Sequence, residues 1–159
     1  MNEEALSGGR SAAAIRDGDT VTRRAGPGAA NIHALLEHLA AGGFALSPPV
    51  LGTSEDGGRE RLSILPGTAG HPPLPATICS EIALGSAARA VLQLHDTAEG
   101  FTPPDPGGWD RQEVTVPAVI DCIGHGDLAP WNLIFDGDQV TGIIFPVKCF
   151  CSSSLAHPS

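Results

Sequence analysis

Short runs of alternating apolar and polar residues near the N-terminus predict a small antiparallel sheet. Residues 11–16 and 19–24 are strand candidates, and the Asp17-Gly18 dipeptide between them favours a tight hairpin turn. Residues 50–52 and 61–65 form a second pair of strand candidates, joined by the polar segment SEDGGRE. The N-terminal part of the chain should therefore contain two hairpins.

Helical spacing replaces this alternation in two places. Four apolar residues recur at i, i+3, i+4 and i+7 before Gly42-Gly43 and predict an amphipathic helix with Asn31 as a candidate N-cap; they are Ile32, Leu35, Leu36 and Leu39. A second helix should begin after Ser80, a good capping residue, and end near Ala98. Its expected apolar face consists of Ile82, Leu84, Ala88, Val91, Leu92 and Leu94.

The segment between these two helices divides the chain into two lobes. Residues 68–77 are rich in proline, glycine and small residues, as linkers are. We expect an N-terminal lobe over residues 1–67, the linker over 68–77, a second lobe over 78–144 and an atypical tail over 145–159. The extended candidates of the second lobe are residues 114–116, 119–123, 133–135 and 140–144, the last two forming a hairpin around residues 136–138.

Composition and charge restrict the classes of function. The 159 residues are enough for one ordinary domain or two small lobes, and 20 glycines with 14 prolines require many loops. Eighteen acidic against nine basic residues give a formal net charge of −9. Nucleic acid is therefore an unfavourable partner, because binding it over a broad surface requires Lys and Arg. The acidic surface either attracts a cationic ligand or serves solubility alone.

The sequence shows no pattern of a membrane-spanning helix, a signal peptide or a disulfide framework. No stretch approaches the ~20 apolar residues of a membrane-spanning helix. The start, MNEEALSGGR, is acidic where a signal peptide would be basic and then apolar, so we expect a cytoplasmic protein that does not contact a membrane. Four cysteines, at positions 79, 122, 149 and 151, are too irregularly spaced for a disulfide framework. Nothing in the sequence specifies an oligomeric state.

The motif with the clearest chemistry is HGDLAPWN, residues 125–132. Phosphoryl transfer needs a carboxylate that orients and deprotonates the attacking hydroxyl, and oxygen ligands that hold Mg²⁺ on the nucleotide phosphates. Asp127 and Asn132 have the spacing of the kinase catalytic loop H-x-D-x-x-x-x-N, in which they would be base and metal ligand. His125 should support the loop by hydrogen bonding. Taken singly, Asp127 could be a turn residue and Asn132 a cap, but the whole motif favours phosphotransfer.

On these residues, the chain resembles the aminoglycoside phosphotransferase and choline kinase-like family. The resemblance covers most of residues 5–144 and includes IGHGDLAPWNLIFDGDQVTGII, the helix ending in VLQLHD, the segment NIHALLEHLAAGGF and the hairpin ending in VTRR. It implies an α+β, protein-kinase-like two-lobe fold, with a small N-terminal sheet plus helix and a helical C-terminal lobe that is incomplete here. It also implies ATP-dependent phosphorylation of a hydroxyl on a small molecule, with Mg²⁺, Asp127 as base and Asn132 on the metal.

The resemblance extends to a basic residue that positions the nucleotide. In the family this residue ends a strand of the first lobe, and Arg23 fits because it shares a strand face with Val21. Most members use lysine there, and arginine keeps the charge but is a planar fork. A solvated strand end beside Arg24 is an equally weighted interpretation. The helix partner is usually a glutamate; Glu37, the only acid in the predicted helix, stands too late to be assigned.

A glycine pair upstream is a weaker candidate for the ATP site. Gly8 and Gly9 would let backbone amides approach a phosphate, although such a pair more often marks an ordinary turn. We keep both as candidate cofactor-binding residues.

The resemblance fails directly after the second hairpin. Family members carry a second metal-binding aspartate in a setting like I-I-D-[FW], whereas this chain has Ile143, Ile144 and Phe145. Loss of that acid should remove much of the charge stabilisation on which transfer depends. Asp136 and Asp138 lie in the predicted hairpin turn and are poor substitutes on geometry. A non-catalytic remnant or nucleotide-binding module is therefore the alternative to an active enzyme.

The tail PVKCFCSSSLAHPS has no helical period and differs in character from what precedes it. We interpret it as the product of a truncation or frame shift after Ile144 that removes helices of the acceptor site. A family-like continuation in another reading frame of the downstream DNA would support this. A zinc site at Cys149, Cys151 and His157 is a weak alternative, because three ligands fall short of four. Lost helices should also expose apolar residues and promote association; these are Leu133, Ile134, Ile143 and Ile144.

Overall fold

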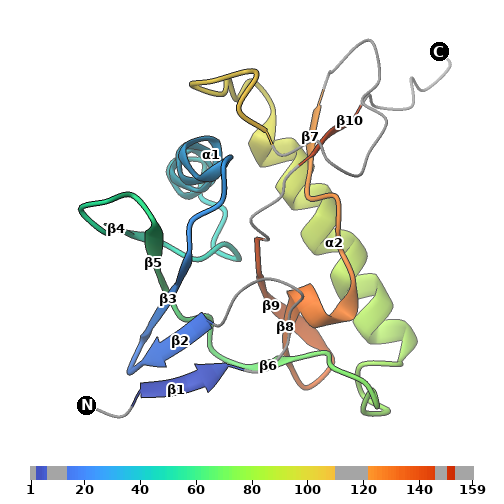
Figure 1. The fold of residues 1–159 in the computed structure, drawn as a ribbon. Coiled ribbons are helices and arrows are strands. Elements are labelled where there is room, and N and C mark those ends of the chain that lie inside the picture. The colour runs from blue at the N-terminus through green and yellow to red at the C-terminus, as the bar shows by residue number, and fades with distance from the viewer. Residues whose placement is uncertain (1–2, 7–13, 110–121, 146–149, 153–159) are drawn as a thin grey trace, which may run out of the picture.

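The computed structural model describes residues 3–6, 14–109, 122–145 and 150–152 (Figure 1). In chain order, its elements are β1 (Glu3–Leu6), β2 (Ala14–Asp17), β3 (Thr20–Arg24), α1 (Ala29–Ala41), β4 (Val50–Thr53), β5 (Arg59–Ser63), β6 (Thr68–Ala69), α2 (Glu81–Ala98), β7 (Cys122–Gly124), the short 3₁₀ helix η1 (Pro130–Asn132), β8 (Leu133–Asp136), β9 (Gln139–Ile143) and β10 (Phe150–Ser152). In Figure 1, β1 to β5 with α1 lie on one side, and α2 with the smaller sheets lies on the other.

The N-terminal part forms a five-stranded antiparallel sheet in the order β1-β2-β3-β5-β4. The first predicted hairpin is confirmed as β2 and β3: Asp17 faces Thr20 across the turn, and Gly18 has φ = 59°, which glycine adopts without strain. The second is confirmed as β4 and β5, joined through a turn in which Ser54 N–H donates to the Arg59 carbonyl at 2.9 Å. Residues 7–13, which include the start of the first predicted strand, lie outside the described residues.

Helix α1 follows the predicted spacing, since Ile32, Leu35, Leu36 and Leu39 are all buried. The prediction of Asn31 as its N-cap is wrong, because the helix begins at Ala29 and Gly28 is the cap. The Asn31 side chain instead donates to the Asp105 carbonyl at 2.6 Å and accepts from the Asp105 N–H at 3.0 Å. A residue that looks like a local cap in the sequence therefore ties α1 to a loop more than seventy residues away.

Helix α2 has the predicted bounds, and Ser80 caps it by accepting a hydrogen bond from the Ala83 N–H at 3.0 Å. Its predicted apolar face is only partly correct, because Leu84 and Leu92 are 72% and 63% exposed. The buried face carries mostly small residues instead, namely Ala83, Ser86, Ala90, Leu94 and Ala98. Small residues allow a close approach, and the Ser86 hydroxyl accepts a hydrogen bond from the Val140 N–H of β9 at 2.9 Å.

The chain after β5 contains two small antiparallel sheets, β6-β8-β9 and β10-β7. Strands β8 and β9 form the predicted hairpin, with Gly137 at φ = 62° in its turn. Strand β6, at the start of the predicted linker, pairs with β8. The expectation that this hairpin would expose apolar residues is wrong for Leu133, Ile134 and Ile143, which are buried. Three of the five large apolar residues that are exposed in the described part of the chain lie on α2, namely Ile82, Leu84 and Leu92.

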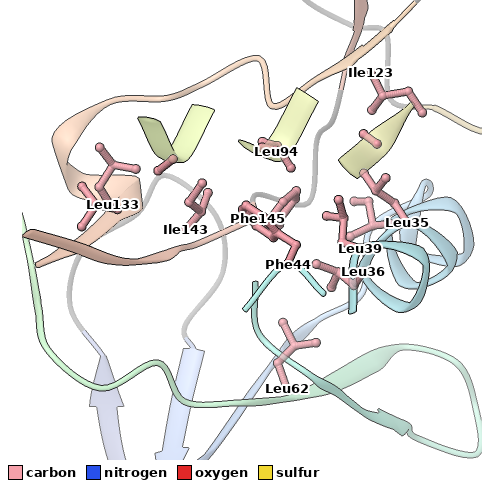
Figure 2. Packing of buried hydrophobic residues seen from close by; sticks show 14 of the residues in the cluster. Leu35, Leu36, Leu39, Phe44, Leu62, Leu94, Ile123, Leu133, Ile143 and Phe145 are labelled. Carbon is pink, nitrogen blue, oxygen red and sulfur yellow. The ribbon is translucent and has the colours of Figure 1, made fainter. Parts of the chain in front are cut away.

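A hydrophobic core of described residues joins the two parts (Figure 2). Leu62 of β5 and the buried face of α1 meet Leu94 of α2 and Ile143 of β9 in this cluster. Phe145 lies among them and is 1% exposed. The Ile143 N–H also donates to the Leu46 carbonyl at 2.7 Å, so backbone bonds cross between the parts as well.

None of the helices in the described part of the chain is both long and apolar enough to cross a membrane. The predicted strand at residues 114–116 and most of the tail, including Cys149 and His157, lie outside the described residues.

Candidate active site

The segment from His125 to Asn132 forms a loop between β7 and β8 that ends in the 3₁₀ turn η1. Gly126 has φ = 76°, a left-handed conformation that permits the sharp turn before Asp127. The Asn132 side-chain amide donates to the Asp127 carbonyl at 2.7 Å and to its carboxylate Oδ2 at 3.0 Å. The loop therefore brings together the two residues that sequence spacing selected, and the Asp127 side chain remains exposed.

The backbone of Ile144 holds both ends of this loop. Its N–H donates to the Asn132 carbonyl at 2.8 Å, and its carbonyl accepts from Nε2 of His125 at 2.7 Å. The peptide units around residue 144 are thus fixed beside the loop. Position 145, where the family pattern has an aspartate, follows directly.

His125 is 1% exposed and supports the loop from inside the core. Burial lowers the pKa of its imidazole, because a charged ring loses its hydration there; the Ile144 carbonyl and the negative charge of Asp127 act in the opposite direction. Its ring meets the ring of Phe145 edge to face, with 5.1 Å between centroids. The hydrogen bond expected for His125 is present, and its acceptor is a carbonyl beyond the hairpin.

The donor set for a Mg²⁺ ion at this loop is incomplete. The Asn132 amide nitrogen faces Asp127, which leaves its amide oxygen as a possible ligand. Phe145 offers no donor atom, and its side chain packs in the core. Asp136 and Asp138 lie at the β8–β9 turn, where the Asp138 carboxylate accepts from the Gln139 amide at 2.7 Å. Among the described residues, no group of three or more His, Cys, Asp or Glu side chains could hold a metal ion.

Arg23 lies in the N-terminal sheet, on the face directed toward α1. It pairs in register with Glu60 of β5, two residues along from the Val21–Leu62 pair, so Arg23 shares a strand face with Val21. The Arg23 Nε donates to Glu60 Oε1 at 2.6 Å, and the Arg23 side chain is only 13% exposed. This excludes the interpretation of Arg23 as a solvated strand end.

Arg23, Glu60 and His33 form a hydrogen-bonded cluster, and Glu60 and His33 were not identified from the sequence. Glu60 is 1% exposed and also bonds Nε2 of His33, on the first half of α1. The sequence does contain a signal for Glu60: it stands two residues before the apolar Leu62, and alternate residues of a strand share a face, so Glu60 should be on the buried face as well. His33 has no such local signal. Glu37 is exposed, and Gly8 and Gly9 lie outside the described residues.

Solved structures that resemble this chain include phosphotransferases. The chain superposes on the GDP complex of aminoglycoside 2′-phosphotransferase-IIIa with a TM-score of 0.67, at 15% identity, over 96% of this chain and 68% of that one. It superposes on a macrolide 2′-phosphotransferase from Brachybacterium faecium with a TM-score of 0.61, at 17% identity, over 93% of this chain and 66% of that one. A choline/ethanolamine kinase family protein from Mesorhizobium loti superposes with a TM-score of 0.60, at 18% identity, over 91% of this chain and 57% of that one. The predicted α+β, protein-kinase-like fold is confirmed.

A curated relative is the trifolitoxin immunity protein of Rhizobium leguminosarum bv. trifolii, 35% identical over 147 residues. The alignment covers 91% of this chain and 55% of the relative, so the chain spans about half the length of that protein. No protein-family model matches the chain.

Proposed function

We propose that this chain, which has the fold of the aminoglycoside and macrolide phosphotransferases, derives from an enzyme that phosphorylates a hydroxyl on a small molecule with ATP. The observation that carries the proposal is the contact of Asn132 with Asp127, because it assembles both polar residues of a kinase loop in one exposed turn. Residues 1–67 would hold the nucleotide, and the loop at 125–132 would face its phosphates.

The chemistry assigned to each residue follows the general scheme of phosphoryl transfer. The acceptor hydroxyl oxygen bonds to the γ-phosphorus as the bond to the bridging oxygen of ADP breaks, and the hydroxyl proton passes to Asp127. Asn132 orients the Asp127 carboxylate through its amide N–H, and its amide oxygen would be a ligand for Mg²⁺ on the phosphates. Arg23 would neutralise phosphate charge from the N-terminal lobe.

The names of similar proteins suggest the acceptor class. The solved structures include phosphotransferases for aminoglycosides and macrolides, and the curated relative is named as an immunity protein against trifolitoxin. We therefore propose a hydroxyl-bearing toxic small molecule as the acceptor, with modification by phosphate as the means of protection. The net charge of −9 is compatible with a cationic acceptor of this kind.

Phe145 supports a second candidate function, nucleotide binding without turnover. Its buried ring stands where the acid would complete the Mg²⁺ site, and the described residues contain no group of three or more His, Cys, Asp or Glu side chains that could hold a metal ion. Without that ligand, much of the charge developing on the phosphates would lack compensation. Such a chain would bind nucleotide but transfer phosphate poorly.

Product formation distinguishes the two candidates. The purified chain is incubated with Mg-ATP and a panel of aminoglycosides, macrolides, other hydroxylated amines and trifolitoxin, and products are detected by the mass of one added phosphoryl group. Catalysis predicts a product whose formation falls by at least about a hundredfold in Asp127→Asn, the range expected for removal of a general base. Asp138→Asn, which removes an acid from the β8–β9 turn, is the matched control and should keep the activity.

Thermal stabilisation of the chain by ATP, without any product, would support the non-catalytic candidate. Equal product from the wild type and Asp127→Asn would contradict the role of Asp127. Absence of both stabilisation and product would refute the proposed function as a whole.

A further inference from the structure

The face of the five-stranded sheet that meets α1 changes from apolar to ionic along its length. The Val21–Leu62 pair is followed two residues along by the Arg23–Glu60 pair. Leu62 belongs to the hydrophobic core, whereas Glu60 is equally buried but charged. Taking a carboxylate out of water is costly unless it is paired and hydrogen-bonded, so Glu60 requires its partners.

Both oxygens of Glu60 are engaged, and by different elements. Oε1 accepts from Nε of Arg23 on β3, and Oε2 bonds Nε2 of His33 on α1. The carboxylate therefore connects strand β3 to helix α1 through strand β5. Neither Arg23 nor His33 is more than 14% exposed in its side chain.

This arrangement differs from the ion pair of protein kinases. There, a lysine on a strand pairs with a glutamate supplied by the helix, and the helix position controls the pair directly. Here the acid comes from strand β5 and the helix supplies His33. The acid of the helix, Glu37, is exposed.

We infer that Glu60 and His33 are positioning residues that hold Arg23 for the phosphates of the nucleotide, an inference that rests on the proposed function. Glu60 occupies Nε of the guanidinium, which leaves the two terminal amino groups for another partner. Nη2 of Arg23 is buried and has no hydrogen-bond partner among the described residues. A phosphate oxygen would satisfy it, because guanidinium and phosphate match in charge and in bidentate geometry.

The same geometry explains why arginine stands where lysine is usual. A lysine ammonium is one point charge on a flexible stem and would have to serve Glu60 and the phosphates with one nitrogen. Arginine separates the two tasks, with Nε toward the carboxylate and its terminal amino groups toward the ligand.

Calorimetric titration with ADP and with adenosine, both without metal, tests the inference. The ratio of the two affinities isolates the contribution of the phosphates. If Glu60 and His33 had a merely structural role, their substitution would weaken the binding of ADP and of adenosine together. Glu60→Gln and Arg23→Lys should each lower the ADP affinity about tenfold or more, the effect of losing one charge-assisted contact, with adenosine affinity unchanged. Glu37→Gln is the matched control and should change neither.

Substitutions at His33 test the helix side without removing a charge from the sheet. His33→Gln retains an amide N–H at the position of Nε2 and should keep most of the preference for ADP over adenosine. In His33→Leu, the ratio of ADP affinity to adenosine affinity should fall several-fold. An unchanged ADP-to-adenosine ratio in both Glu60→Gln and His33→Leu would overturn the inference. If Arg23→Gln lowers the ADP-to-adenosine ratio while Glu60→Gln and His33→Leu do not, Arg23 keeps its role toward the phosphates and only the positioning role of Glu60 and His33 fails. If the wild type binds neither ligand, the proposed function fails with it.

Discussion

His125 shows how a single buried residue couples loop geometry to pH. Its pKa is lowered in the folded chain, mainly because burial penalises the charged ring, while in the unfolded chain it should titrate near its ordinary value of about 6.5. Between the folded and unfolded pKa values, the unfolded chain carries a proton that the folded chain lacks. The free energy of unfolding should therefore fall as the pH falls from about 7 through the folded pKa.

Replacing His125 should flatten this pH dependence. His125→Gln keeps an N–H donor for the Ile144 carbonyl but does not titrate, so the free energy of unfolding should change less between about pH 7.5 and 5.5 than in the wild type. Urea unfolding at both pH values measures it. His125→Leu lacks the donor as well and should be less stable at the higher pH with the same flattened slope. Wild-type slopes in both variants would contradict the prediction.

Single residues were predictable from the sequence where their partner is close in the chain. Asp127 and Asn132 are five residues apart, and the contact between them follows from a loop motif with fixed spacing. Glu60 and His33 could not be paired in this way, because their contact depends on how α1 packs on the sheet. Arg23 was selected through the resemblance and its role stays a prediction, whereas its buried partner Glu60 was not selected.

Among the elements, the short strand β6 has more influence on the candidate site than its length suggests. The Gly70 N–H, directly after β6, donates to the Pro130 carbonyl at 3.0 Å and thereby reaches the turn that carries Asn132. A Cβ on Gly70 would lie 2.7 Å from that carbonyl oxygen. Only glycine permits this approach of two backbones.

Gly70→Ala should therefore disturb the loop as well as the stability of the fold. The clash involves backbone on the Pro130 side, so we expect a loss of about 1–3 kcal/mol in the free energy of unfolding, as for overpacked sites. Gly85→Ala, in the N-terminal third of α2, is the matched control, because the nearest atom to the added Cβ is a flexible Arg89 nitrogen at 3.5 Å; it should stabilise by about 0.5–1 kcal/mol. Chemical denaturation measures both, and similar values for the two variants would contradict the prediction.

Element boundaries followed from local signals more reliably than the buried faces did. Ser80 and the apolar spacing give the bounds of α2, because capping and helical period are local properties. The face that α2 buries packs against β9, α1 and β7, and it carries small residues such as Ser86 and Ala90. Large apolar residues dominate a hydrophobicity pattern, so the sequence selected Leu84 and Leu92, which are exposed.

For the molecule as a whole, the exposed side of α2 is the principal apolar surface among the described residues. Leu84 and Leu92, with the exposed Ala88 between them at four-residue spacing, lie on one side of the helix. Exposed apolar surface of this kind favours association in water. The surface differs from the one expected from the sequence, which was on the β8–β9 hairpin.

Association should therefore depend on α2. We expect the wild-type chain to self-associate with increasing concentration in sedimentation velocity experiments, and the double variant Leu84→Gln with Leu92→Gln to shift toward monomer. Glutamine retains helix propensity close to that of leucine, so α2 should persist. Leu51→Gln, at an exposed position on β4, is the matched control and should leave the association unchanged. A wild type that stays monomeric at all concentrations would contradict the prediction.

The hydrogen bonds by which Ile144 closes the loop make the loop tolerant of substitution at position 144. Both groups that Ile144 contributes belong to the main chain, so any residue except proline could provide them at that position. The loop can therefore keep its shape when the residue at position 144 is exchanged, because the Ile144 side chain takes no part in these two hydrogen bonds.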